Sequence, residues 1–147
     1  MFKDIDKQKI LRIIDANLNR TREALRVCED ISRFILEDKR ISRRLKLTRQ
    51  KVFTVIRDSG LDYLKILENR NSVDDVGKRT TAAESTRANW QAVFLANIER
   101  AKEAARALEE FSKIINKELA QRFKRIRFTI YDIEKETIIR YKSLSRT

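Results

Sequence analysis

Carboxylates and cations gather around a glycine near the middle of this chain. Two acids and two bases flank Gly77 in the run Asp74-Asp75-Val76-Gly77-Lys78-Arg79, and Glu84 and Arg87 follow it. Carboxylates bind Mg²⁺ and arginines bind phosphate, so these residue types suit a segment that closes over a phosphorylated ligand. We take Asp75 and Glu84 as candidate catalytic residues, Asp75 also as a candidate metal ligand, and Arg87 as a candidate phosphate-binding residue. The spacing is a weak signal, because acidic turns are common and neither glycine of the chain lies in a P-loop motif.

A second group of candidates is polar but falls on or beside the apolar faces of predicted helices, where each residue turns by about 100°. These candidates are Asn17, Arg20, Arg49, Asn97, Arg100 and Arg127. A buried amide or guanidinium group must find partners, so we expect side-chain hydrogen bonds, above all at the two asparagines, Arg49 and Arg127. Two interpretations stay open. The group binds an anionic ligand such as phosphate, or it forms a structural network in which the arginines pair with carboxylates such as Glu23 and Glu103.

The same helical phase predicts whether other notable side chains are buried or exposed to solvent. It predicts Cys28 and Trp90 in the core, so Cys28 is a small core residue rather than a nucleophile. It places four acids on the solvated side, paired with Arg26 and Arg106 at helical spacing. These acids are Glu29, Asp30, Glu109 and Glu110.

Composition excludes whole classes of chemistry. The 147 residues contain no histidine, no proline, two glycines and one cysteine. Without histidine there is no Ser-His-Asp triad and no imidazole metal ligand, and a lone cysteine supports neither an intrachain disulfide nor a thiolate zinc cluster. A chain of this length is able to bury one sizeable core, and we expect a single domain over residues 1–147.

The charge balance points to polyanionic partners. The chain carries 34 Lys plus Arg against 22 Asp plus Glu, a formal net charge of +12. Seven bases and no acid occupy Lys39 to Lys51, a block that suits either a solvated helix face or a contact with nucleic acid or phospholipid. No run approaches the roughly 20 apolar residues of a membrane span. We therefore expect no membrane partner and a cytoplasmic location.

Helical periodicity predicts an all-α fold. Four apolar stripes, which start near Ile10, Ile41, Trp90 and Phe123, favour four main helices in two hairpins that form an antiparallel bundle. Asp38 and Thr81 are candidate helix caps. Turn-forming residues dominate 59–81, interrupted by a short apolar stretch at 61–67, so we expect a hinge there.

An internal repeat relates the two hairpins. Residues 14–35 align with 94–115 at an offset of 80, with nine identities in 22 positions: Ala16/Ala96, Asn17/Asn97, Arg20/Arg100, Glu23/Glu103, Ala24/Ala104, Arg26/Arg106, Glu29/Glu109, Ser32/Ser112 and Ile35/Ile115. At an offset of 78, Arg49 corresponds to Arg127. The alignment predicts duplicated halves at 10–58 and 88–141, related by a pseudo-twofold axis.

Several motifs resemble a known family. They are Arg12-Ile13-Ile14-Asp15-Ala16-Asn17-Leu18-Asn19-Arg20, Arg22-Glu23-Ala24-Leu25-Arg26-Val27, Glu29-Asp30, Asp75-Val76-Gly77, Arg87-Ala88-Asn89 and Ala96-Asn97 with Arg100, Glu103-Ala104 and Arg106. Over nearly the whole chain they resemble the helical domain that precedes thiamine phosphate synthase in some bacteria. The chain departs from that pattern at Lys78, where a Thr is expected.

The resemblance implies an ATP-dependent phosphotransferase of thiamine biosynthesis. This family is understood as an alternative hydroxymethylpyrimidine phosphate kinase, which converts 4-amino-5-hydroxymethyl-2-methylpyrimidine phosphate to its diphosphate. The implied ligands are the pyrimidine phosphate, ATP and Mg²⁺, thiamine phosphate synthase is an implied partner, and a homo-oligomer stays open. The alternative is a basic helical bundle that binds nucleic acid or a partner protein without catalysis.

Overall fold

The fold is a bundle of helices with two short helical additions. In the computed structural model, residues 4–79 and 85–146 are described, and they contain no strand. The elements are α1 (Asp4–Phe34), α2 (Lys39–Asp58), α3 (Tyr63–Glu68), α4 (Trp90–Ile115), α5 (Lys117–Arg140) and the 3₁₀ helix η1 (Lys142–Arg146). The all-α prediction is confirmed, and the predicted hinge contains one additional helix, α3.

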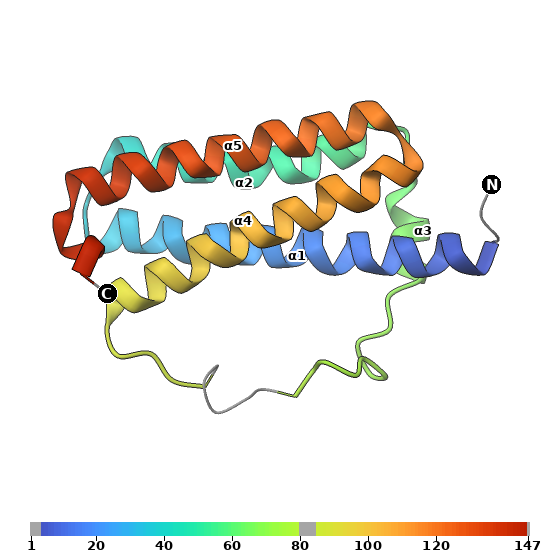
Figure 1. The fold of residues 1–147 in the computed structure, drawn as a ribbon, viewed down its shortest axis with the longest axis horizontal. Helices are drawn as coiled ribbons and strands as arrows, with labels where there is room; N and C mark the ends of the chain where they lie inside the picture. The colour runs from blue at the N-terminus through green and yellow to red at the C-terminus, as the bar shows by residue number, and fades with distance from the viewer. Residues whose placement is uncertain (1–3, 80–84, 147) are drawn as a thin grey trace.

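The four long helices form a ring in which each packs against two neighbours. The packed pairs are α1 with α2, α2 with α5, α5 with α4, and α4 with α1. Neighbouring helices run antiparallel, and residues 69–79 and 85–89, between α3 and α4, lie along the outside of the bundle below α1 (Figure 1). The hinge is long because α3 and the start of α4 lie at opposite ends of the bundle.

Polar side chains that directly precede α2 and α4 cap these helices. Asp38 accepts a hydrogen bond from the Ile41 N–H at the start of α2, and Asn89 accepts one from the Ala92 N–H at the start of α4. These caps satisfy N–H groups that have no partner within the helix. The predicted cap at Asp38 is confirmed, whereas Thr81 lies outside the described residues. After α2, Gly60 adopts φ +83°, a left-handed conformation that favours glycine at a helix C-terminus.

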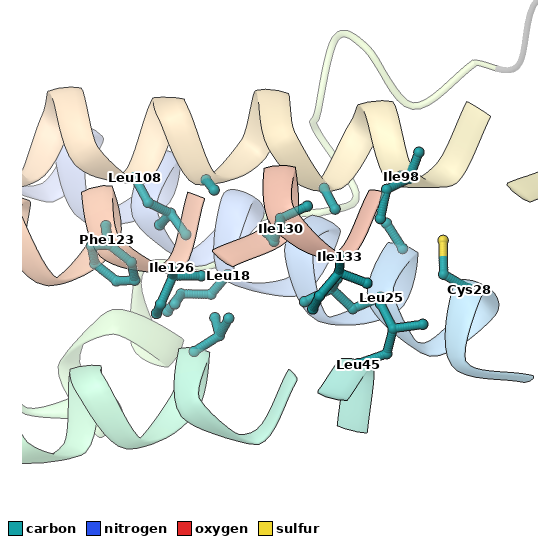
Figure 2. Close-up of a cluster of buried hydrophobic side chains, with 14 of the residues drawn as sticks. Leu18, Leu25, Cys28, Leu45, Ile98, Leu108, Phe123, Ile126, Ile130 and Ile133 are labelled. Carbon is teal, nitrogen blue, oxygen red and sulfur yellow. The ribbon is translucent and has the colours of Figure 1, made fainter. Parts of the chain in front are cut away.

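One apolar core runs through all four long helices. Leu18 and Cys28 of α1, Leu45 of α2, and Ile98 of α4 meet the inner face of α5, which carries Phe123, Ile126, Ile130 and Ile133 (Figure 2). Cys28 is fully buried, as predicted, and its thiol lies 3.7 Å from the carbonyl oxygen of Phe94 on α4. Burial raises the pKa of this thiol, so Cys28 packs as an apolar group and is no nucleophile. Trp90 is partly buried against the core. Within the described residues, no helix is long and apolar enough to span a membrane.

Candidate functional site

A cavity lies between α1 and the segment that follows α3. Its volume is about 610 Å³, and we call it the motif cavity. Asn17, Arg20 and Asp75, three residues predicted from sequence as site residues, line it together. One turn earlier on α1, Lys9 and Arg12 add positive charge to its wall. The motif Arg12 to Arg20 therefore presents cations and an amide to a hollow of ligand size.

An ion pair holds the hinge segment against α1 and so shapes this cavity. Arg70, just after α3, donates from Nε and one Nη to the two carboxylate oxygens of Asp15, both at 2.7 Å. Asp15 is 4% exposed, and the Asp15 hydrogen bonds raise the pKa of the Arg70 guanidinium above its ordinary value. Bidentate pairs of this kind fix geometry as well as charge. Neither residue is predicted from sequence as a positioning residue; Asp15 lies within the motif that resembles the known family, and no spacing signal points to Arg70.

The side-chain amide of Asn17 bonds to its own helix through the nitrogen, while the residue lines the motif cavity. Asn17 is 6% exposed and donates from Nδ2 to the Ile13 carbonyl oxygen at 2.8 Å. Asn97 makes the matching bond to the Val93 carbonyl oxygen, also at 2.8 Å, and is half-buried. The prediction that both asparagines face inward with side-chain hydrogen bonds is confirmed. These bonds use only the NH₂ group, which leaves the Asn17 carbonyl oxygen available to a ligand.

Asp75 supplies a carboxylate at the opposite wall. Its Oδ1 accepts from the Gly77 N–H at 2.8 Å, which gives the exposed loop a fixed turn. Glu23 of α1 also lines the cavity, and neither acid has an ion-pair partner among the described residues. Within residues 4–79 and 85–146, no group of three or more Asp, Glu, Cys or His side chains is placed to hold a metal ion. Mg²⁺ is commonly held by one or two carboxylates together with substrate phosphates, and Asp75 and Glu23 fit that donor set.

The other predicted site residues lie away from the motif cavity. Arg87 and Arg100 are exposed, Arg87 before α4 and Arg100 on it, and Asn97 is half-buried on α4. Arg49 and Arg127 face inward as predicted, with side chains 16% and 10% exposed. Glu84 lies outside the described residues. The structure thus gathers Asn17, Arg20 and Asp75 and places the other described members of the set elsewhere.

The prediction that Glu29 and Glu109 are solvated is wrong. Each is 5% exposed and bound to an arginine of the next helix. Arg49 donates to Glu29 at 3.2 Å, and Arg127 donates to Glu109 at 3.0 Å. These glutamates, rather than Glu23 and Glu103, are the partners of the inward arginines. The physical reason is that α2 and α5 cover the flanks of α1 and α4, a second buried face that a single apolar stripe does not reveal. Asp30 and Glu110 are partly exposed and pair with Arg26 and Arg106 as expected.

Two further hollows continue the motif cavity along α1. The first, about 390 Å³, shares Asn19 and Glu23 with the motif cavity and adds Arg22; we call it the bridging hollow. The second, about 970 Å³, lies between the C-terminal half of α1 and the start of α2; we call it the basic groove. Arg26 and Arg49 line both the bridging hollow and the basic groove. The shared lining residues place these three hollows next to one another along the first hairpin.

Comparison with known proteins assigns the chain to a family. A model of the ThiD2 family matches residues 12–136. The chain belongs to the ThiD2 family. The matched range includes the α1 motif, the segment at Asp75 and most of both long hairpins. The residues that line the basic groove, and all those that line the motif cavity except Lys9, lie within it.

Curated relatives of this ThiD2 chain are longer proteins. A thiamine-phosphate synthase of Prochlorococcus marinus (strain AS9601) is 37% identical over 134 residues, which cover 90% of this chain and 36% of the relative. A thiamine-phosphate synthase of Rhodopirellula baltica is 33% identical over 141 residues, 95% of this chain and 37% of the relative. The chain therefore spans a little over a third of the length of these relatives. No solved structure matches it.

Proposed function

We propose that this protein phosphorylates 4-amino-5-hydroxymethyl-2-methylpyrimidine phosphate to the diphosphate, with ATP as phosphoryl donor. Membership of the ThiD2 family carries the proposal, together with the similarity to proteins named thiamine-phosphate synthase. The activity places the chain in thiamine biosynthesis, and its product is a substrate of the kind that a thiamine-phosphate synthase consumes. A synthase, fused or separate, is therefore the proposed partner.

The motif cavity supports this proposal by its size and its charge. It brings Lys9, Arg12 and Arg20 to one wall, and none of them pairs with a carboxylate among the described residues. A monophosphate and the transferred phosphoryl group together carry several negative charges, which such cations neutralise. The amide oxygen of Asn17 suits the amino group of the pyrimidine, because an amide carbonyl accepts from an exocyclic NH₂.

The reaction suits a protein without histidine. The nucleophile is an oxygen of the substrate's own phosphate, whose second pKa is about 6, so most of it is already dianionic at neutral pH. That oxygen forms a bond to the γ-phosphorus while the bond from this phosphorus to the β,γ-bridging oxygen breaks, and ADP leaves. No side chain has to remove a proton, and catalysis consists mainly of positioning and charge neutralisation.

We propose Asp75 as the carboxylate that holds Mg²⁺ with the nucleotide phosphates. The metal, when bound, neutralises charge on the donor phosphates. Asp75 is held in place by the Gly77 N–H, and Arg70 keeps the whole segment against α1 through Asp15. Glu84 remains a candidate catalytic residue on sequence grounds, and Arg49, Arg87, Asn97, Arg100 and Arg127 remain candidates for substrate binding.

The decisive experiment measures diphosphate formation by the purified protein from the pyrimidine monophosphate, ATP and Mg²⁺. We expect one diphosphate and one ADP per turnover. In Asp75→Asn, turnover falls by more than about tenfold. The melting temperature stays within about 2 °C, because Asn keeps the oxygen that accepts from Gly77 and the loop is exposed.

The control is Asp132→Asn, which removes the same charge from an exposed position on α5 and leaves turnover unchanged. Wild-type protein that forms no diphosphate contradicts the proposed activity. Normal turnover in Asp75→Asn contradicts only the role of that carboxylate.

A further inference from the structure

The two hairpins repeat the same contacts at the offsets seen in the sequence. Glu29 pairs with Arg49 in the first hairpin, and Glu109 pairs with Arg127 in the second. Arg22 lies over the ring of Phe53 at 5.3 Å, and Lys102 lies over the ring of Tyr131 at 5.2 Å. The matching pairs are separated by 80 residues on the first helices and by 78 on the second. One hairpin can therefore serve as an internal control for the other.

In the second hairpin the buried cation is neutralised. Lys102 forms ion pairs with Glu99 at 2.7 Å and with Glu134 at 3.0 Å. Burial alone would lower the pKa of the Lys102 ammonium, but hydrogen bonds to these two carboxylates raise the pKa above its ordinary value. The positive charge of Lys102 is therefore fully matched by neighbouring acids.

In the first hairpin the matching cation has no such acids. Asn19 stands where the second hairpin has Glu99, and Ile56 stands where it has Glu134. Arg22 lines the bridging hollow, and its Nε is buried without a hydrogen-bond partner among the described residues. A buried donor without a partner is unfavourable, and the second hairpin instead meets the charge of Lys102 with Glu99 and Glu134 from its own chain.

The basic groove also contains more positive than negative side chains. Its wall holds six bases, Arg26, Arg33, Lys39, Arg43, Lys46 and Arg49, against three acids, Glu29, Glu37 and Asp38. Two of the acids are already engaged, Glu29 by Arg49 and Asp38 by Arg140 from outside the groove. Among the described residues, no ion pair involves Arg33, Lys39, Arg43 or Lys46. The groove is therefore strongly positive.

The second hairpin keeps five of these six bases at matching positions but differs from the first hairpin at other positions of the groove wall. Gln121 replaces Arg43, and Phe128 replaces Gln50. Phe128 places its ring 5.0 Å from the guanidinium of Arg127 and 6.0 Å from the ammonium of Lys124. Arg127 and Lys124 thus lie beside the ring of Phe128, whereas Arg49 and Lys46, at the matching positions of the first hairpin, line the open groove.

We infer that the nucleotide phosphates are bound by the first hairpin rather than the second, and that its basic groove binds the oligophosphate chain of a nucleoside triphosphate. This inference rests on the proposed kinase function, since it gives the nucleotide a place beside the motif cavity. The bridging hollow, with Arg22 and Arg26, connects the groove to that cavity. The groove's volume of about 970 Å³ lies within the range of roughly 300–1,000 Å³ that is usual for ligand sites.

The test measures binding without turnover, by titration calorimetry of the intact protein in the absence of the pyrimidine. MgATP and inorganic tripolyphosphate are the two phosphate probes, and adenosine shows what the base and sugar contribute. We expect both phosphate probes to bind and Lys46→Glu to weaken each by about tenfold or more, the loss expected for one charged hydrogen bond. Arg43→Gln, which installs the residue of the second hairpin, weakens them as well.

The matched control is Lys124→Glu, the same charge reversal at the corresponding exposed position of the second hairpin. We expect it to change the dissociation constants by less than about twofold, because its effect is screened at a distance. Equal weakening by both reversals, or no binding of either probe to the wild type, overturns the inference. Duplex DNA that binds more tightly than MgATP and is lost in Lys46→Glu also overturns it.

These measurements separate the inference from the proposed function. If the protein binds tripolyphosphate through Lys46 but forms no diphosphate, the phosphate-binding role of the groove is supported and the kinase activity is contradicted. If the wild type forms the diphosphate and Lys46→Glu leaves the KM for ATP unchanged, the kinase activity is supported and the role of the groove in binding ATP is contradicted.

Discussion

The inward arginines act chiefly on the partner helix. Arg127 of α5 reaches Glu109 of α4 with two donors, Nε at 3.1 Å and Nη at 3.0 Å. Both side chains are almost buried, so each charge depends on the other for the interactions that water would otherwise supply. Such a pair fixes the register between two helices more than it adds net stability.

Removing one partner of that pair should be costly. Glu109→Gln leaves the Arg127 guanidinium buried without a counter-charge, and we expect the free energy of unfolding to fall by about 3 kcal/mol. Urea denaturation followed by circular dichroism measures this change. The double variant Glu109→Gln/Arg127→Met should recover part of the loss, since it leaves no unpaired charge.

The control for that prediction is Glu103→Gln on the exposed side of α4, which should alter the unfolding free energy by no more than about 0.5 kcal/mol. Equal destabilisation at positions 103 and 109 would show that the buried pair has no special role.

At the level of single residues, helical periodicity predicted correctly which polar side chains face inward, but it did not predict their hydrogen-bond and ion-pair partners. Asn17, Arg49 and Arg127 face inward as their helical phase required. Glu29 lies at the border of the apolar arc of α1, and its burial depends on where α2 packs, which one helix considered alone does not specify. Arg70 could not be found at all, because its role depends on the path of the chain after α3.

At the level of elements, Asp38 joins three parts of the bundle. Its side chain caps α2 through the Ile41 N–H, accepts from the Tyr141 hydroxyl at 2.8 Å, and pairs with Arg140 at 3.3 Å. Burial opposes ionisation, but these hydrogen bonds and the Arg140 charge hold the pKa of the carboxyl below its ordinary value. Asp38 thereby ties the turn between α1 and α2 to the end of α5.

The effect of Asp38 on stability should depend on pH. A carboxyl with a lowered pKa in the folded state stabilises the protein above its unfolded pKa of about 3.9 and loses this effect as the pH falls through the folded value. Asp38→Asn keeps a capping oxygen and removes the charge. We expect it to lower the unfolding free energy at pH 7, and we expect the difference from wild type to shrink as the pH approaches 3.

Urea denaturation of both proteins from pH 7 to pH 3 measures that difference. Asp38→Ala, which also loses the cap, should be less stable than Asp38→Asn by about 1 kcal/mol at every pH. A wild-type advantage over Asp38→Asn that stays constant with pH would contradict the role of the charge.

The long helices were predictable because their apolar stripes and capping residues agree. The hinge was predictable only as a region of turn chemistry. Its short helix α3 has six residues and one buried side chain, Ile66, so it depends on contact with α1 rather than on its own sequence. For the same reason, only Asn17, Arg20 and Asp75 of the residues that line the motif cavity were predicted from sequence as site residues, and the shape of the cavity was not predicted.

At the level of the whole molecule, the repeated contacts favour the proposal that two duplicated hairpins share one core. The buried side chains of α1, α2, α4 and α5 belong to one apolar cluster rather than to one cluster per hairpin. Each hairpin buries its apolar face against the other, because α1 packs on α4 and α2 packs on α5. Neither half can then lose its structure without exposing the core of the other.

We therefore predict a single cooperative unfolding transition, and the chain contains a natural probe in each half. Its only cysteine, Cys28, is fully buried in the first hairpin, and its only tryptophan, Trp90, is partly buried at the start of α4 in the second. In increasing urea, reactivity of the Cys28 thiol, Trp90 fluorescence and helical circular dichroism should change with the same midpoint. Thiol reactivity that appears at clearly lower urea than the fluorescence change would mean that the hairpins unfold separately, which contradicts a shared core.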